Sequence, residues 1–237
     1  MRVALIIACL LSLSHSAVAG DIFWRFPNKI SASERYLFYV HGKIIETDGV
    51  SPISPRFGHY QFHRIVTRLA KGRANVIARV RRGETGPHAE AFRLANEIRY
   101  LLKQGVPAAH ISVAGFSKGG YITLLTANRL QNADIRYVVM AGCTRAIVEG
   151  RDRVADGFQG TVMSMSDTVD DLGFSCRPLF ERNPQLSAVM DVIFETGKGH
   201  GLFYRADPEW IEPLLQWVEM EKQPEGETAR SGNPARG

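Results

Sequence analysis

The feature that most constrains the fold of this chain is the regular alternation of two kinds of apolar segment. Short runs rich in β-branched and aromatic residues are typical of strands, and they fall at residues 36–40, 76–80, 111–114, 137–141, 161–165 and 192–195. Segments whose apolar residues recur every three or four positions are typical of amphipathic helices, and they fall at 60–70, 89–102, about 119–130 and 208–220. Strands that alternate with helices require right-handed crossovers, so this order predicts an α/β fold, a mostly parallel central sheet with helices on both faces.

Local signals agree with this interpretation. Residues 137–141 read YVVMA, a continuous apolar run that is typical of a strand buried on both sides. Gly105 and Pro107 follow one predicted helix and indicate its end, and Asp207 before Pro208 indicates the start of the last helix. The sequence contains no internal repeat, so residues 20–221, roughly 200 in number, are expected to form a single domain.

The two ends of the chain differ in composition from this region. Arg2, the apolar run 3–13 and the small residues 17–19 are typical of a secretory signal peptide at 1–19, since the run is shorter than the roughly 20 residues that span a bilayer. Cleavage would leave Gly20 as the first residue of an exported protein, periplasmic or secreted, with no stable membrane anchor. Residues 222–237 carry almost no apolar side chain and are expected to be a disordered tail.

Cysteine use and charge exclude several classes of site. Loss of the signal peptide removes Cys9 and leaves Cys143 and Cys176, which an oxidising compartment would allow to form one disulfide. Neither cysteine has the closely spaced Cys or His neighbours of a zinc site, so no metal and no cofactor are predicted. The 29 Lys and Arg residues exceed the 24 Asp and Glu residues, but they are spread along the chain without a dense basic run, and no nucleic-acid partner is predicted.

One turn in the middle of the chain carries a chemical signature. Residues 115–119 read GFSKG and join the predicted strand 111–114 to the helix that follows. This is the G-x-S-x-G pattern, in which a strained backbone projects the serine above the sheet while glycines on both sides let strand and helix approach closely. Gly115 and Gly119 are the two glycines, and Ser117 is the candidate nucleophile.

The turn and its setting resemble the α/β-hydrolase family, in which a serine, an acid and a histidine follow one another along the chain. The resemblance implies a base after the last strand, where His200 lies, and an acid after the strand 161–165. Asp167 is the first carboxylate after that strand and is the preferred triad acid, with Asp170 as the alternative. The acid would hold the imidazole tautomer and stabilise the imidazolium.

The resemblance also implies an oxyanion hole made of backbone N–H groups. After the strand 36–40 the residues His41, Gly42 and Lys43 resemble the His-Gly turn of the family. By position, the donors would be the N–H groups of Lys43 and of Lys118, the residue after the nucleophile. His41 itself is expected to be structural.

Two neighbouring segments are open to more than one interpretation. The long polar loop 44–58 leaves the same edge of the predicted sheet as the candidate catalytic residues, so it either faces the substrate or is an ordinary surface loop. Arg79, Arg81 and Arg82 end the next strand, where they either recognise a carboxylate or phosphate or simply face water.

The predicted activity is hydrolysis of a carboxylic ester or related acyl bond by an acyl-enzyme route. Roughly 20 residues separate the strands at 137–141 and 161–165, too few for the helical lid of many family members, so an open site and a small or polar acyl substrate are expected. A disulfide between Cys143 and Cys176 would fix the loop that carries the acid. The alternatives are an acyltransferase or peptidase that uses the same triad, and a catalytically silent binding protein of the cell envelope.

Overall fold

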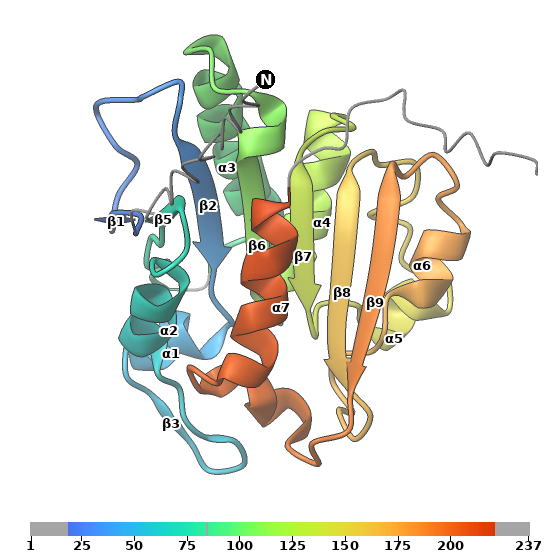
Figure 1. Cartoon of the computed structure of the whole chain (residues 1–237). Helices are drawn as coiled ribbons and strands as arrows, with labels where there is room; N and C mark the ends of the chain where they lie inside the picture. The colour runs from blue at the N-terminus through green and yellow to red at the C-terminus, as the bar shows by residue number, and fades with distance from the viewer. Residues whose placement is uncertain (1–18, 84, 221–237) are drawn as a thin grey trace, which may run out of the picture.

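A single parallel sheet forms the centre of the molecule. The computed structural model describes residues 19–83 and 85–220, so all but the last residue of the signal peptide predicted at 1–19, and the whole tail predicted at 222–237, lie outside the described residues. Seven strands follow the order β1-β5-β2-β6-β7-β8-β9, and every neighbouring pair is parallel (Figure 1). The strands are β1 (Ile22–Phe23), β2 (Arg35–Val40), β5 (Ala74–Ile77), β6 (Ile111–Phe116), β7 (Arg136–Met140), β8 (Thr161–Asp167) and β9 (Ala188–Phe194).

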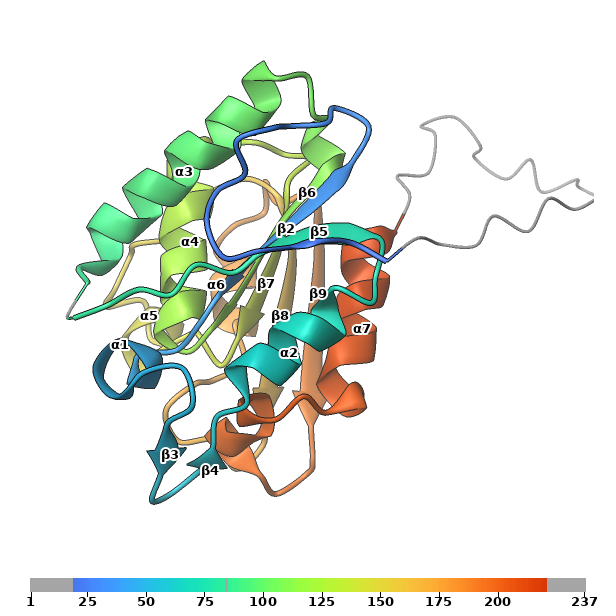
Figure 2. The ribbon, with the colours of Figure 1, turned by 90° about the vertical axis from the view of Figure 1, so that its left-hand side faces the viewer.

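Helices cover both faces of this sheet and bury its side chains in two layers. The helices α2 (Phe62–Leu69) and α7 (Pro208–Glu219) pack on one face, and α3 (Pro87–Lys103) and α4 (Lys118–Leu130) pack on the other (Figure 2). The shorter elements are α1 (Ile44–Asp48), the strand pair β3 (Ile53–Ser54) and β4 (Gly58–His59), the 3-10 turns η1 (Ala108–His110) and η2 (Gly199–Tyr204), α5 (Arg145–Val148) and α6 (Arg177–Glu181). The prediction of an α/β fold with helices on both faces of the sheet is confirmed.

The long helix α3 illustrates how the sequence specifies its elements. It begins with Pro87 in the first turn, where the missing N–H has no intrahelical acceptor to lose. Its buried face presents Leu94, Ile98 and Leu101 at helical spacing. It ends before Gly105, whose φ of +87° reverses the chain at little steric cost.

Three sequence predictions about element bounds were wrong. The strand predicted at 76–80 lies at Ala74–Ile77, because its pairing with β2 begins at Ala74 and its pairing with both β2 and β1 ends at Ile77. The strand predicted at 192–195 begins at Ala188, since Asp191, which interrupts the apolar run, is accommodated on the edge strand by a hydrogen bond from Ser175. The loop predicted at 44–58 contains α1, β3 and the first residue of β4.

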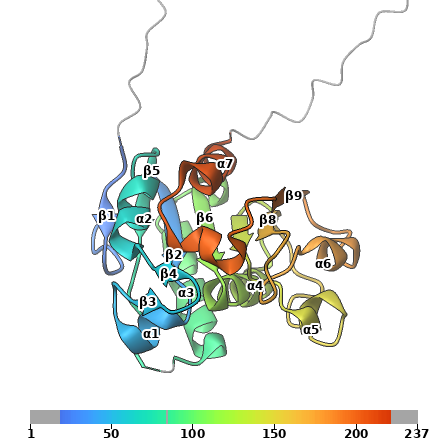
Figure 3. The ribbon, with the colours of Figure 1, turned by 90° about the horizontal axis from the view of Figure 1, so that it is seen from below.

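The parallel sheet brings distant loops to one edge. All seven strands of the sheet point the same way, and their carboxyl ends lie at the lower edge in Figure 1. Seen from that edge, η2, the β3-β4 pair and the start of α4 surround the ends of β2 and β6 (Figure 3). Open parallel sheets bind ligands at this edge. None of the described helices is long and apolar enough to cross a membrane.

Candidate active site

The turn between β6 and α4 has the strained geometry of a nucleophile elbow. Ser117 has φ 55° and ψ −119°, a conformation that side-chain-bearing residues rarely adopt. Its N–H donates to the Met140 carbonyl at 2.8 Å, which ties the strained residue to the end of β7. A Cβ on Gly119 would lie 1.9 Å from the Val40 carbonyl oxygen, and one on Gly115 would lie 2.1 Å from the Gly119 carbonyl oxygen. Both positions therefore require glycine.

His200 and Asp170 form a buried hydrogen-bonded pair. The two atoms His200 Nδ1 and Asp170 Oδ2 are 2.8 Å apart, and the Asp170 side chain is fully buried. The second oxygen, Oδ1, accepts the N–H groups of Leu172 at 2.9 Å and Gly173 at 3.1 Å. Since a carboxylate only accepts, Nδ1 carries a proton, and in the neutral imidazole Nε2 of His200 is then the acceptor.

The structure places Asp170, the alternative acid, against His200, whereas Asp167, the preferred acid, makes its hydrogen bonds elsewhere. The Asp167 carboxylate faces Thr196, accepting its N–H at 3.0 Å and its hydroxyl at 2.5 Å, and it also accepts the Val169 N–H at 3.1 Å. Burial alone would raise the pKa of Asp167, but these hydrogen bonds outweigh it and lower the pKa. Asp167 thus joins the ends of β8 and β9, and the turn after it carries Asp170 back to the histidine.

The His200 ring lies next to the elbow. Its centroid is 4.8 Å from the ring of Phe116, the residue before Ser117, and 5.5 Å from the ring of Phe57 on the loop 44–58. No hydrogen bond joins Ser117 to His200 within the described ranges. In ligand-free enzymes, the bond between nucleophile and base is often long and tightens only when substrate binds.

A disulfide fixes the loop that carries Asp170. Cys143 follows β7, Cys176 precedes α6, and the structure joins their sulfurs with Cα atoms 5.4 Å apart. The Phe174 N–H also donates to the Cys143 carbonyl at 2.8 Å. The acid-bearing loop is therefore held to the end of the neighbouring strand by a covalent and a hydrogen bond.

The two backbone segments predicted to form an oxyanion hole lie side by side. Lys118 is the first residue of α4, whose first N–H groups have no intrahelical acceptor. Gly42 packs directly on the elbow, where a Cβ would lie 3.1 Å from the Phe116 ring and 3.6 Å from the Ser117 Cβ. Lys43, the next residue, is the N-cap of α1.

His41 is a buried structural residue, as expected. Its Nε2 accepts the Arg81 N–H at 2.9 Å, so the proton lies on Nδ1, which donates to the Gly42 carbonyl at 2.8 Å. Burial, and next the charge of the Arg81 guanidinium, lower the pKa of His41 to about 3. The ring is therefore neutral at physiological pH.

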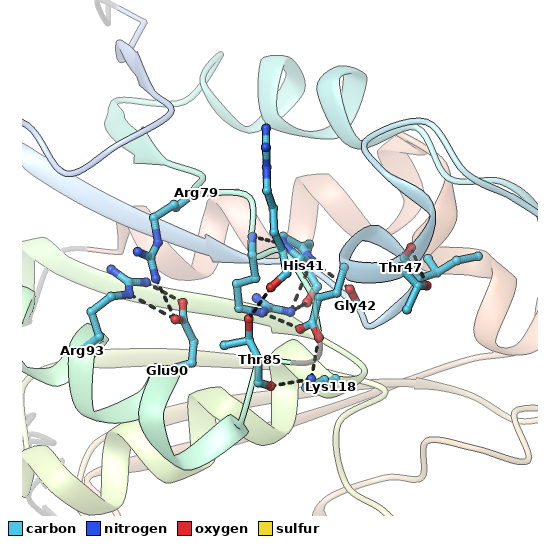
Figure 4. A network of polar contacts seen from close by, with 12 residues as sticks. His41, Gly42, Thr47, Arg79, Thr85, Glu90, Arg93 and Lys118 are labelled. Carbon is cyan, nitrogen blue, oxygen red and sulfur yellow. Dashed lines mark hydrogen bonds and ion pairs between the residues drawn. The ribbon is translucent and has the colours of Figure 1, made fainter.

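Two of the three arginines after β5, Arg79 and Arg81, form ion pairs with carboxylates, which sequence reasoning missed. Arg81 is buried and donates through Nε to Glu46 at 2.8 Å, and Arg79 donates to Glu90 on α3 at 2.7 Å (Figure 4). Arg82 alone of the three is exposed. Glu46 lies on the loop 44–58, whose polar composition gave no indication of a buried carboxylate.

A surface cleft of about 370 Å³ opens beside Ser117. Its walls include Lys118 and Tyr121 from α4, Thr144 and Asp152 from the segment after β7, and Leu172 from the acid loop. Tyr121 donates to Asp152 at 3.1 Å, and burial and this carboxylate raise the pKa of Tyr121 to about 12. The cleft is thus lined by both polar and apolar side chains.

Comparison with known proteins supports the fold assignment. No family model and no curated protein matches the sequence. The structure resembles a protein from Staphylococcus aureus provisionally described as an esterase, with a TM-score of 0.56, 12% identity, and coverage of 84% of this chain and 79% of that one. It also resembles a lipase-esterase related protein from Clostridium acetobutylicum (TM-score 0.50, 16% identity, coverage 79% and 96%) and the Pyrococcus furiosus esterase Pf2001 (0.50, 13%, 79% and 83%). The chain has the α/β-hydrolase fold.

Proposed function

We propose that this protein is a serine hydrolase that cleaves a carboxylic ester or related acyl bond through an acyl-enzyme intermediate. The observation that carries the proposal is the buried His200–Asp170 pair beside the strained Ser117 elbow. A histidine whose Nδ1 is held by a carboxylate presents Nε2 as a base, and a serine on such a turn presents its hydroxyl above the sheet.

The proposed reaction has two halves. The Ser117 Oγ attacks the acyl carbon while His200 Nε2 takes the hydroxyl proton, and the N–H groups of Lys43 and Lys118 stabilise the oxyanion. The tetrahedral intermediate collapses, and His200 returns the proton to the leaving alcohol. Water then attacks the acyl-serine with His200 again as base, which releases the acid and restores Ser117. Asp170 stabilises the imidazolium at each stage.

We propose a small or polar acyl substrate. The cleft beside Ser117 is open, and it combines the Tyr121–Asp152 pair with the exposed apolar side chain of Leu172. A series of nitrophenyl esters of increasing acyl length tests this point. We expect kcat/KM to be highest for short acyl chains, and a clear preference for long chains would contradict the proposal.

Labelling by a fluorophosphonate tests the nucleophile. We expect the folded wild type to be labelled, with the mass increase on the peptide containing Ser117, and Ser117→Ala to be unlabelled. Ser112→Ala is a matched control, because Ser112 is a buried serine on β6, the strand that leads to Ser117, and it lies at the opposite end of that strand. An unlabelled wild type would favour a silent binding protein, and a labelled Ser117→Ala would exclude Ser117 as the nucleophile.

We also propose export with cleavage before Gly20. The Gly20 nitrogen lies 3.0 Å from the Ala70 carbonyl oxygen and 2.9 Å from that of Gly72, just past the C-terminus of α2. An amide has one hydrogen for these two acceptors, whereas a free ammonium has three and is favoured near a helix C-terminus. We expect the mass of the exported protein to begin at Gly20. Recovery of the uncleaved chain from the cytoplasm would contradict this.

A further inference from the structure

A buried ionic cluster lies behind the predicted oxyanion hole. Glu46 on α1 accepts from Arg81 Nε at 2.8 Å through Oε1 and from Lys118 Nζ at 2.6 Å through Oε2. The side chains of Glu46, Arg81 and Lys118 are 0%, 1% and 19% exposed. Lys118 Nζ donates in addition to the Thr85 carbonyl at 2.7 Å (Figure 4). The cluster thus connects α1, the segment after β5 and the first residue of α4.

Such a cluster is a poor way to gain stability. Burying charges costs free energy that their mutual attraction repays only in good geometry, and apolar side chains of similar size often stabilise a fold as well or better. What the cluster provides is a fixed geometry between its members, because each Glu46 oxygen accepts from a different cation. The structure therefore favours a role for the cluster in positioning the segments that it joins over a role in stabilising the fold.

The cluster also orients the peptide between Gly42 and Lys43. Arg81 donates its N–H to His41 Nε2 and its guanidinium to the His41 carbonyl, and His41 Nδ1 donates to the Gly42 carbonyl. In a trans peptide the carbonyl and the following N–H point in opposite directions. Holding the Gly42 carbonyl against His41 therefore aims the Lys43 N–H away from the His41 ring.

We propose that Glu46 and Lys118 are positioning residues, which hold the two backbone donors of the oxyanion hole at a fixed separation. One donor, the Lys43 N–H, belongs to the N-cap residue of α1, the helix that carries Glu46. The other donor, the Lys118 N–H, belongs to the residue whose side chain Glu46 binds. The inference rests on the proposed function and extends it to two side chains that act through the position of the backbone donors.

The test is a comparison of Lys118→Met, Lys118→Arg and Glu46→Gln. Lys118→Met keeps the backbone donor and the Arg81–Glu46 pair but removes the link between the two segments. Loss of a whole oxyanion donor costs about 10² to 10³ in rate, so a misplaced donor is expected to lower kcat by about 10- to 100-fold with little change in KM. Lys118→Arg, which retains a cation and donors, is expected to recover part of the loss.

Binding of a trifluoromethyl ketone separates positioning from a general structural role. The ketone adds to an active-site serine and forms an oxyanion, so its inhibition constant reports the oxyanion hole directly. We expect Lys118→Met to weaken this inhibition in proportion to the fall in kcat/KM. The double variant with Glu46→Gln should be no worse than the poorer single variant, because both remove the same link. Lys103→Met, an exposed lysine at the opposite end of the sheet, is the control.

The outcomes distinguish the two proposals. If the wild type is active, the positioning role would be overturned by a folded Lys118→Met whose kcat is unchanged. It would also be overturned by a folded Lys118→Met whose KM rises while its inhibition by the ketone is unchanged. A folded wild type that neither hydrolyses esters nor reacts with a fluorophosphonate would overturn the proposed function and the positioning role with it.

Discussion

Replacing Asp170 by Asn is the sharpest test of the site geometry. The Asp170 carboxylate lies 2.8 Å from His200 Nδ1 and is fully buried, so in the proposed reaction it faces the imidazolium of the transition state without competition from water. At a charge separation of about 4 Å and an effective dielectric constant of about 20, this attraction is about 4 kcal/mol. That corresponds to about 10³-fold in rate. We therefore expect Asp170→Asn to lower kcat/KM by about 10³-fold.

Asp167→Asn is the matched control, since it makes the same chemical change three residues away. Asp167 bonds to Thr196 and Val169, not to His200, so the expected effect on kcat/KM is below about 10-fold, with a loss of about 1 to 3 kcal/mol in the free energy of unfolding. Initial rates on a short-chain nitrophenyl ester and urea unfolding curves measure both quantities. Equal effects of the two variants on kcat/KM, or a larger effect of Asp167→Asn, would refute the assignment of Asp170.

Three further predictions follow from the packing around the site. A Cβ on Gly119 would meet the Val40 carbonyl oxygen at 1.9 Å, so Gly119→Ala is expected to abolish activity and lower the Tm. Gly86→Ala, where the added Cβ meets open space, is the control and should change the Tm by less than about 3 °C and the activity by less than about 2-fold. A fully active Gly119→Ala would contradict the elbow geometry. The disulfide joins cysteines 33 positions apart, so the double variant Cys143→Ala/Cys176→Ala is expected to lose about 3 to 4 kcal/mol of its free energy of unfolding and roughly 10 °C in Tm. A reductant should lower the Tm of the wild type and leave that of the double variant unchanged. The pKa of His41 is lowered to about 3, so between pH 6.5 and 3 the unfolded chain binds a proton at this residue that the folded chain does not. The free energy of unfolding is therefore expected to decrease as the pH is lowered from 6.5 to 3, by up to about 1.4 kcal/mol per pH unit. An identical pH dependence in His41→Gln would refute this.

The sequence alone was sufficient wherever the information is local. The alternation of strand and helix patterns depends on spacings of two to four residues, and it predicted the parallel sheet and both helical layers. The turn that carries Ser117 is also local, because its glycines lie two positions on either side of the serine. The sequence proposed His200 as the base from its order along the chain, after the last strand, and the structure places its ring beside the elbow.

The tertiary structure decided the choices that depend on which segments meet. Asp167 and Asp170 are three positions apart and are the same type of residue. The pairing of β8 with β9 nevertheless places Asp167 against Thr196, and the next turn directs Asp170 to His200. Glu46 and Lys118 are 72 positions apart and bond because β2, which precedes α1, pairs with β6, which precedes α4. Hydrophobic spacing records which face of an element is buried, whereas the partner of a buried charge is set by strand order, which no local pattern contains.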